Sequence, residues 1–240
     1  MSTTTATGFR APPAWVVFLF IGLGVAALGV AILMPVKPPV VQSGDGGVGV
    51  VTPPVYPDAP PFVLTERLGG TVDNTSLDGK VWVASFAFTR CKYCPSVTAT
   101  MAKLRGEMGL TNSDDFRLVT FTIDPEHDTP DELKKYADKF TGKPNDPNWL
   151  FLHGSERSIR LLCQRGFKVG VEKKDDAPVE LMYDHYLGLL LIDKKGRVRG
   201  TYMGKPPARE GDDKDVEAGF KEFERNYAEL KEKVAELLRE

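Results

Sequence analysis

The chain has 240 residues, an apolar content of 42% and a formal net charge of −2 at pH 7. This apolar fraction is ample for a packed core. With 31 basic and 33 acidic residues and no basic stripe, the composition argues against nucleic-acid binding. Only three cysteines are present, which excludes a disulfide-built scaffold and leaves a few thiols for chemistry.

The N-terminal region predicts a membrane anchor. Residues 14–34 are 21 uncharged residues, and as a helix they would span roughly 30 Å, the thickness of a hydrocarbon core. The alternative is a cleaved signal peptide, whose apolar region usually runs about 7–15 residues. The greater length favours an anchor, preceded by an N-terminal tail at 1–13.

The flanks of this stretch bear on location. Arg10 before it and Lys37 after it give almost no charge bias, so the positive-inside rule does not fix the orientation. One arginine within residues 1–13 is unlike a mitochondrial transit peptide. We therefore favour a bacterial inner membrane, with the domain on the periplasmic side, over a mitochondrial inner membrane.

The next two segments are predicted to be a linker and a domain. Residues 35–61 are dominated by proline and glycine, which is typical of a spacer without fixed structure. The folded domain is expected over 62–240. Its predicted elements are strands at 62–66 and 70–74, a strand at 81–88, a helix at 95–107, a strand at 118–123, a helix at 129–140, a strand at 149–152, a helix at 155–165, strands at 186–192 and 198–202, and a helix at 215–238.

This alternation of strands and helices predicts an α/β fold with a central mixed sheet flanked by helices. In such sheets, functional sites gather beyond the carboxyl ends of the strands. The apolar residues of the last helix recur in steps of four and three, so we expect one face to pack on the sheet. The part after Tyr227 is an alternative candidate for a small projecting interaction surface.

Cys91 and Cys94 follow the apolar strand at 81–88 and precede a helix, a context typical of a thioredoxin-like thiol motif. Helix N-termini stabilise a thiolate, and we expect Arg90 and Lys92 to lower the thiol pKa further. A zinc half-site is the alternative. Structural zinc takes four ligands, commonly from two paired motifs, and the chain has no second pair.

His185 precedes the strand predicted at 186–192, and in a thioredoxin-like sheet that loop faces the cysteine pair. Two thiolates and an imidazole suit copper, with the thiolates favouring Cu(I). We therefore predict that Cys91, Cys94 and His185 meet. His127 and His153 are expected to be solvated, and Cys163 to be a small buried apolar residue.

Several segments together resemble the Sco/SenC family. The cysteine motif Phe88-Thr89-Arg90-Cys91…Cys94-Pro95, the segment Thr122–Pro130, and His185 followed by Leu191–Gly200 occur in the family's order. The resemblance implies a thioredoxin fold and copper, as Cu(I) or Cu(II), bound by Cys91, Cys94 and His185. It also implies that Asp124 supports the site from outside the ligand set.

The same resemblance implies a partner, namely the cytochrome c oxidase subunit that carries the CuA centre. Other copper chaperones and thiol–disulfide reductases are further expected partners. One departure matters: the family usually has three residues between its cysteines, whereas this chain has two. Two functions therefore stay open, copper delivery and thiol–disulfide exchange through Cys91 and Cys94. A non-enzymatic, tethered binding or redox-sensing module is a third.

Overall fold

The computed structural model describes residues 58–209 and 212–240. The tail at 1–13, the predicted anchor at 14–34 and all of the linker except 58–61 lie outside these residues. Within the described part, no helix is both long enough and apolar enough to cross a bilayer.

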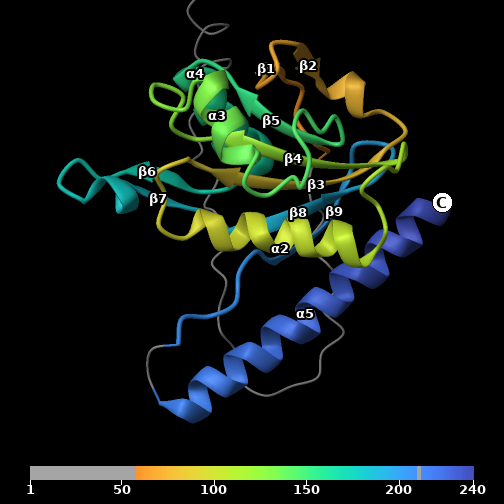
Figure 1. The fold of residues 1–240 in the computed structure, drawn as a ribbon, viewed down its shortest axis with the longest axis vertical. Coiled ribbons are helices and arrows are strands. Elements are labelled where there is room, and N and C mark those ends of the chain that lie inside the picture. The colour runs from red at the N-terminus through yellow and green to blue at the C-terminus, as the bar shows by residue number, and fades with distance from the viewer. Residues whose placement is uncertain (1–57, 210–211) are drawn as a thin grey trace, which may run out of the picture. The chain divides into compact units, whose positions relative to one another are not determined.

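A mixed seven-stranded sheet forms the centre of the domain (Figure 1). Its spatial order is β2-β1-β5-β4-β3-β8-β9. The three central strands β5, β4 and β3 run parallel, and the outer neighbours are antiparallel. The mixed α/β architecture expected from the sequence is therefore confirmed. The strands are β1 (Val63–Glu66), β2 (Thr71–Asp73), β3 (Val81–Ala87), β4 (Phe116–Thr122), β5 (Trp149–His153), β8 (Gly188–Ile192) and β9 (Val198–Met203).

Helices cover both faces of this sheet, because every residue of β3 is buried and successive side chains point to opposite faces. Val81 and Val83 pack with α2, α3 and α5, whereas Trp82 and Phe86 pack with α4 and the π-helical turn η2. The helices are α2 (Cys94–Glu107), α3 (Pro130–Ala137), α4 (Glu156–Leu161), η2 (Leu162–Phe167) and α5 (Asp213–Arg239), with short 3₁₀ turns η1 (Asn74–Leu77) and η3 (Val179–Leu181).

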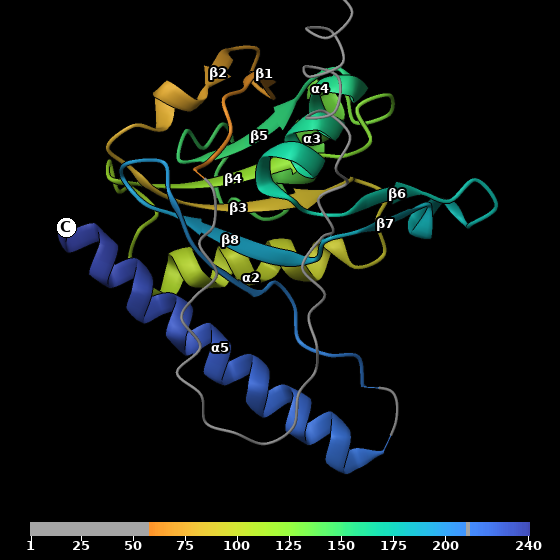
Figure 2. The ribbon, with the colours of Figure 1, turned by 180° about the vertical axis from the view of Figure 1, so that it is seen from behind.

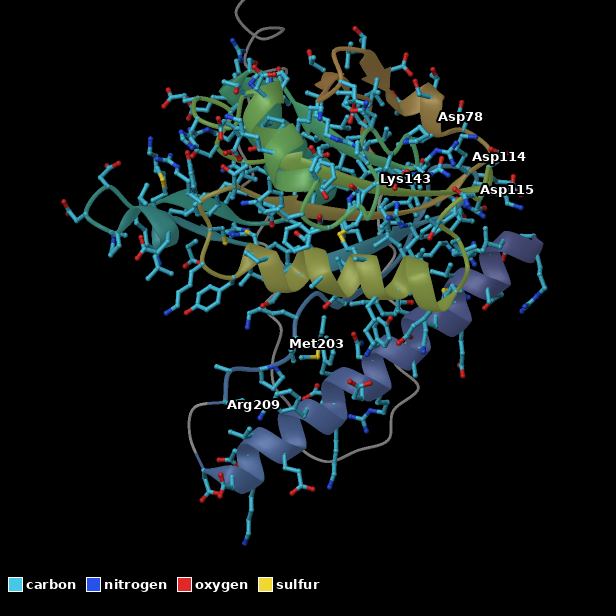
Figure 3. All side chains as sticks on the ribbon, viewed as in Figure 1. Asp78, Asp114, Asp115, Lys143, Met203 and Arg209 are labelled. Atoms are coloured by element: carbon cyan, nitrogen blue, oxygen red, sulfur yellow. The ribbon has the colours of Figure 1, made fainter. Side chains whose placement is uncertain are left out.

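A separate two-stranded ribbon, β6 (Val171–Lys173) and β7 (Tyr183–His185), extends from the domain (Figures 1 and 2). The sequence does not predict this ribbon, because three-residue strands with exposed polar residues carry no apolar alternation. The strand predicted at 186–192 begins only at Gly188, after the chain has left the ribbon. Asp78, Asp114 and Asp115 lie at the opposite end of the sheet (Figure 3).

Helix α5 packs one face on the sheet as expected, but the alternative expected for its end is wrong. Its C-terminal half is the buried part: Tyr227, Leu230, Val234 and Leu237 all join the core. Val216, near its beginning, is only partly buried. The small interaction surface predicted after Tyr227 is therefore wrong, since the apolar stripe of that half already packs on the sheet.

Candidate metal and thiol site

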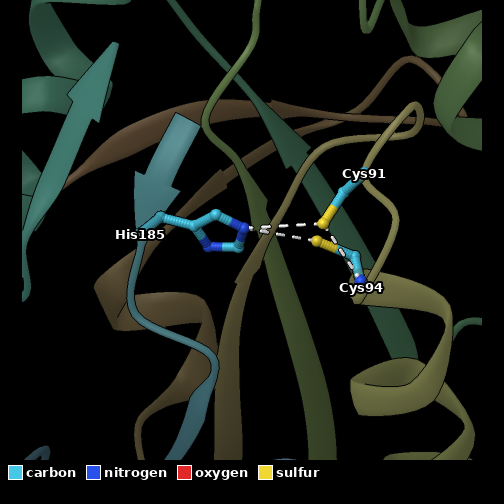
Figure 4. A group of neighbouring side chains, drawn as sticks. All are labelled: Cys91, Cys94 and His185. Atoms are coloured by element: carbon cyan, nitrogen blue, oxygen red, sulfur yellow. Dashed lines mark hydrogen bonds between the residues drawn. The ribbon is translucent and has the colours of Figure 1, made fainter. Parts of the chain in front are cut away.

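Three side chains from two distant segments converge beyond the carboxyl end of β3. Cys91 lies in the turn after that strand, Cys94 is the first residue of α2, and His185 ends β7. The His185 Nε2 atom is 3.6 Å from the Cys91 sulfur and 3.5 Å from the Cys94 sulfur (Figure 4). All three ligand atoms lie within 4.8 Å of one another. The structure thus brings together the three residues that the sequence singled out.

The turn before α2 directs backbone donors at the Cys91 sulfur. The backbone N–H groups of Tyr93 and Cys94 donate to it at 3.3 and 3.1 Å. These groups belong to the start of α2, where N–H groups have no partner within the helix. Pro95 lies in the first turn, where its missing N–H costs nothing. The helix start therefore stabilises negative charge on Cys91.

The two thiols have opposite pKa shifts. Hydrogen bonding from the Cys94 side chain, followed by that from His185, lowers the pKa of Cys91 to about 5 against the opposing effect of burial. Burial, and then the neighbouring Cys91, raises the pKa of Cys94 far above its usual range. At neutral pH, Cys91 is the thiolate and Cys94 keeps its proton. Hydrogen bonds to the Cys91 sulfur are the main cause of its lowered pKa. The positive charges of Arg90 and Lys92, from which the lowering was expected, are not among the main causes.

His185 is oriented by its other ring nitrogen. Its Nδ1 atom lies 3.2 Å from the carbonyl oxygen of Tyr186. A carbonyl oxygen only accepts, so Nδ1 carries the proton. Nε2 is then the ring nitrogen that faces the two sulfurs. This is the orientation by which proteins prepare a histidine to bind a metal.

Asp124 lies behind the site and is only 2% exposed. Its carboxylate accepts a hydrogen bond from the Arg90 guanidinium at 2.5 Å and another from the Tyr183 hydroxyl at 3.4 Å. Arg90 precedes Cys91, and Tyr183 lies two residues before His185. Asp124 therefore joins the cysteine turn to the ribbon without bonding to either thiol or to the imidazole.

Asp128 is a supporting residue that the sequence analysis missed. It is fully buried and accepts hydrogen bonds from the Thr89 backbone N–H at 3.0 Å, from the Thr89 hydroxyl at 2.5 Å and from the Thr122 hydroxyl at 2.6 Å. Burial raises its pKa. It fastens the chain just before Cys91 to β4, and nothing in the sequence distinguishes it from the other acids of its loop.

The remaining cysteine and the other two histidines do not join this cluster. Cys163 is fully buried as expected, and burial raises its pKa to about 12. His127 is exposed as expected. His153 departs from expectation: it is partly buried, and its Nε2 lies 3.1 Å from the Pro125 carbonyl oxygen.

A pocket of about 350 Å³ gives access to the site. Cys91 and His185 line this pocket, together with residues of the ribbon and of η3. Cys94 has no exposed surface, whereas the neighbouring Tyr93 is 38% exposed. A partner entering the pocket therefore meets the Cys91 sulfur first.

Comparison with known proteins decides the family. A profile of the SCO1/SenC family matches residues 54–218, which is more than half of the chain and includes the whole site. The chain belongs to the SCO1/SenC family. The resemblance noted from the motifs is thus confirmed.

Relatives and solved structures agree. The chain is similar to the SCO1 protein homolog of Bacillus subtilis, with 34% identity over 161 residues that cover 66% of this chain and 80% of that protein. It is also similar to the crystal structure of a SCO1/SenC family lipoprotein from Bacillus anthracis, with 31% identity, a TM-score of 0.56, and coverage of 74% of this chain and 99% of that chain.

A third similar structure bears on redox chemistry. BsSco, described as a member of the Sco family of cytochrome c oxidase assembly proteins with a disulfide switch, is 30% identical with a TM-score of 0.53. The alignment covers 72% of this chain and 95% of that one.

Proposed function

We propose that this SCO1/SenC protein is a membrane-anchored copper-binding assembly factor that delivers copper to the CuA subunit of cytochrome c oxidase. The observation that carries the proposal is the meeting of Cys91, Cys94 and His185, whose ligand atoms all lie within 4.8 Å. Family membership, together with the description of BsSco as an oxidase assembly protein, supports the partner.

The donor set fits copper as cargo. Two thiolates and one imidazole are soft and borderline ligands, and thiolates select Cu(I). Sulfur–nitrogen separations of 3.5 and 3.6 Å suit three ligands around one ion, given that such bonds to transition metals measure about 2.0–2.3 Å. Since Cys94 is protonated at neutral pH, binding the ion must release its proton, and copper affinity should rise with pH.

We place the domain on the outer face of a bacterial inner membrane, held there by the anchor at 14–34 and the linker at 35–61. The likeness to a Bacillus anthracis family member described as a lipoprotein supports a membrane-attached domain. Copper would come from another copper chaperone, and a thiol–disulfide reductase would keep the cysteine pair reduced. Two measurements test this placement. Fractionation shows whether the chain is in the membrane, and protease added to spheroplasts shows whether the domain is on the outer face.

Competition titration with Cu(I) tests the ligand set. The full chain in detergent is titrated against a Cu(I) chelator of known affinity, alongside His185→Ala and the matched control His127→Ala. The proposal predicts that His185→Ala weakens binding about tenfold or more, whereas removal of the exposed His127 has no effect. Equal affinity of the His185→Ala variant and the wild type would show that the three-residue site is wrong.

A second candidate function is thiol–disulfide exchange. It is favoured by the two-residue spacing and by the opposite pKa shifts of Cys91 and Cys94. The Cys91 thiolate would attack a substrate disulfide, forming a mixed disulfide and releasing one substrate thiolate. Cys94 would then lose its proton and attack the Cys91 sulfur. This breaks the mixed disulfide, closes the Cys91–Cys94 disulfide and releases the second substrate thiolate, so that two electrons pass to the substrate.

Trapping distinguishes this second function. In a Cys94→Ser variant the mixed disulfide has no resolving thiol and should accumulate in the native membrane. Cys163→Ser is the matched control, because the Cys163 thiol is buried and its pKa is raised, so it should not react with a substrate disulfide. If the Cys94→Ser variant yields no covalent partner under oxidising conditions, the exchange function is wrong for this protein.

A further inference from the structure

One feature of the site entrance is not used by copper binding. Tyr93 lies beside Cys91 in the wall of the pocket, and two lysines approach its ring. The ammonium of Lys92 is 5.5 Å from the ring centroid, and that of Lys205 is 5.2 Å away. Both distances are within the range of a cation–π contact. The mouth of the pocket thus has an aromatic ring with two positive charges against it.

Lys205 reaches this position because the chain after β9 approaches α2 closely. A Cβ on the preceding Gly204 would lie 2.2 Å from the Leu187 carbonyl oxygen and 3.0 Å from a methyl group of Val97. Glycine is therefore required there, and the next residue, Lys205, is brought against the ring of Tyr93, which lines the pocket. Lys92 and Lys205, which are 113 positions apart in the sequence, are held together by the fold.

The charge of these lysines is not neutralised locally. Lys174, another lysine of the pocket wall, pairs with Asp184 at 3.1 Å. Neither Lys92 nor Lys205 forms an ion pair within the described part of the chain, and their contacts with Tyr93 leave the positive charge in place. Glu180, an exposed acid, lines the same pocket from the ribbon side. The mouth of the pocket therefore has a positive side at Tyr93 and a negative charge at Glu180.

Apolar surface accompanies this charge. Six large apolar side chains are exposed in the described residues, and three of them, Tyr93, Val179 and Leu181, belong to the pocket wall or to η3 beside it. Clustered exposed apolar groups around a reactive group are typical of a docking surface.

We infer that Tyr93, Lys92 and Lys205 form a docking surface for an acidic protein segment that presents sulfur ligands to Cys91. The inference rests on the proposed function, since it specifies the partner's chemistry at the same site. Carboxylates beside the partner's cysteines would meet the two lysines while the partner's sulfur enters the pocket. Complementary charge of this kind acts mainly on the association rate and on the choice of partner.

The test uses three peptides of equal length, each with one cysteine joined to thionitrobenzoate by a disulfide. Their flanking residues are glutamate, glutamine or lysine. When the Cys91 thiolate attacks the peptide sulfur, a protein–peptide disulfide forms and the electron pair leaves with the coloured thionitrobenzoate thiolate. The full chain in detergent is used without copper. Cys91→Ser is the negative control and should not release thionitrobenzoate at the rate of the wild type.

We expect the glutamate peptide to react about tenfold faster than the lysine peptide at low ionic strength. The ratio should approach one in about 1 M salt, where the Debye length is about 3 Å. Lys92→Gln with Lys205→Gln should abolish the preference at low salt. Lys80→Gln, which removes one charge at the opposite end of β3, should preserve it, and Glu180→Gln should increase it.

The inference is overturned by equal rates for the three peptides, by an equal loss of preference in Lys80→Gln, or by no reaction with any peptide. The inference is also wrong if the double variant loses binding to anionic lipid vesicles but reacts with the three peptides at the rates of the wild type. Because no copper is present, failure of the copper proposal in the His185→Ala titration leaves this rate ratio unaffected. The two proposals can therefore fail separately.

Discussion

The carboxylate of Asp124 lies 2.5 Å from the Arg90 guanidinium and thereby fixes the turn that carries Cys91. Its second oxygen accepts the hydroxyl of Tyr183, which belongs to the strand that ends in His185. One buried carboxylate thus connects the turn that carries Cys91 with the strand that carries the imidazole. Loss of this residue should affect copper binding even though it is not a ligand.

We predict that Asp124→Asn weakens Cu(I) binding about tenfold, because partners that orient metal ligands typically contribute 10–100-fold in affinity. The measurement is the same chelator competition. Glu126→Gln, an exposed acid of the same loop, serves as the control and should bind like the wild type. An affinity of Asp124→Asn equal to that of the control would show that Asp124 does not position the site.

The pH dependence of thiol reactivity follows from the lowered pKa of Cys91. Alkylation of the reduced chain by a small iodoacetamide reagent should label Cys91 with a midpoint near pH 5. Cys94, whose pKa is raised, should stay unlabelled throughout the neutral range. Mass spectrometry of the peptides measures both residues at once. A Cys91 midpoint between about 8 and 9, the range of an ordinary cysteine, would contradict the hydrogen-bonding account.

The same shift affects the free energy of unfolding of the reduced chain. The folded pKa of Cys91 is about 5 and the value for an unperturbed thiol is 9.0. Because the folded value is the lower one, the stabilisation is fully present above about pH 9 and declines as the pH falls toward 5. Subtracting the pH profile of Cys91→Ser isolates this contribution, and parallel profiles would contradict it.

The packing of α5 predicts an asymmetry along one helix. Leu230→Ala should lower the free energy of unfolding by about 2–5 kcal/mol, because it leaves a cavity in the core. Val216→Ala, on the less buried first turns, should change it by about 0.5 kcal/mol or less. Denaturant unfolding measures both variants, and equal effects would show that α5 does not pack through its C-terminal half.

Much of this site could be predicted from the sequence because its signals are local. The apolar run at 81–88 and the spacing of Cys91 and Cys94 predict a strand followed by thiols at a helix start. His185 is predicted from topology and from the family resemblance, since the strand that carries it has no periodic pattern. The ribbon, the role of Asp128 and the pairing of Arg90 with Asp124 depend on contacts between distant segments, which residue spacing does not reveal.

In the proposed site, two sulfurs and one imidazole hold the same copper ion. X-ray absorption spectroscopy of the Cu(I)-loaded full chain counts these ligands, with His185→Ala measured beside the wild type. We expect two sulfur neighbours and one nitrogen neighbour, with the nitrogen contribution lost in the variant. Identical spectra for the two proteins, or a copper shell made of sulfur alone, would contradict it.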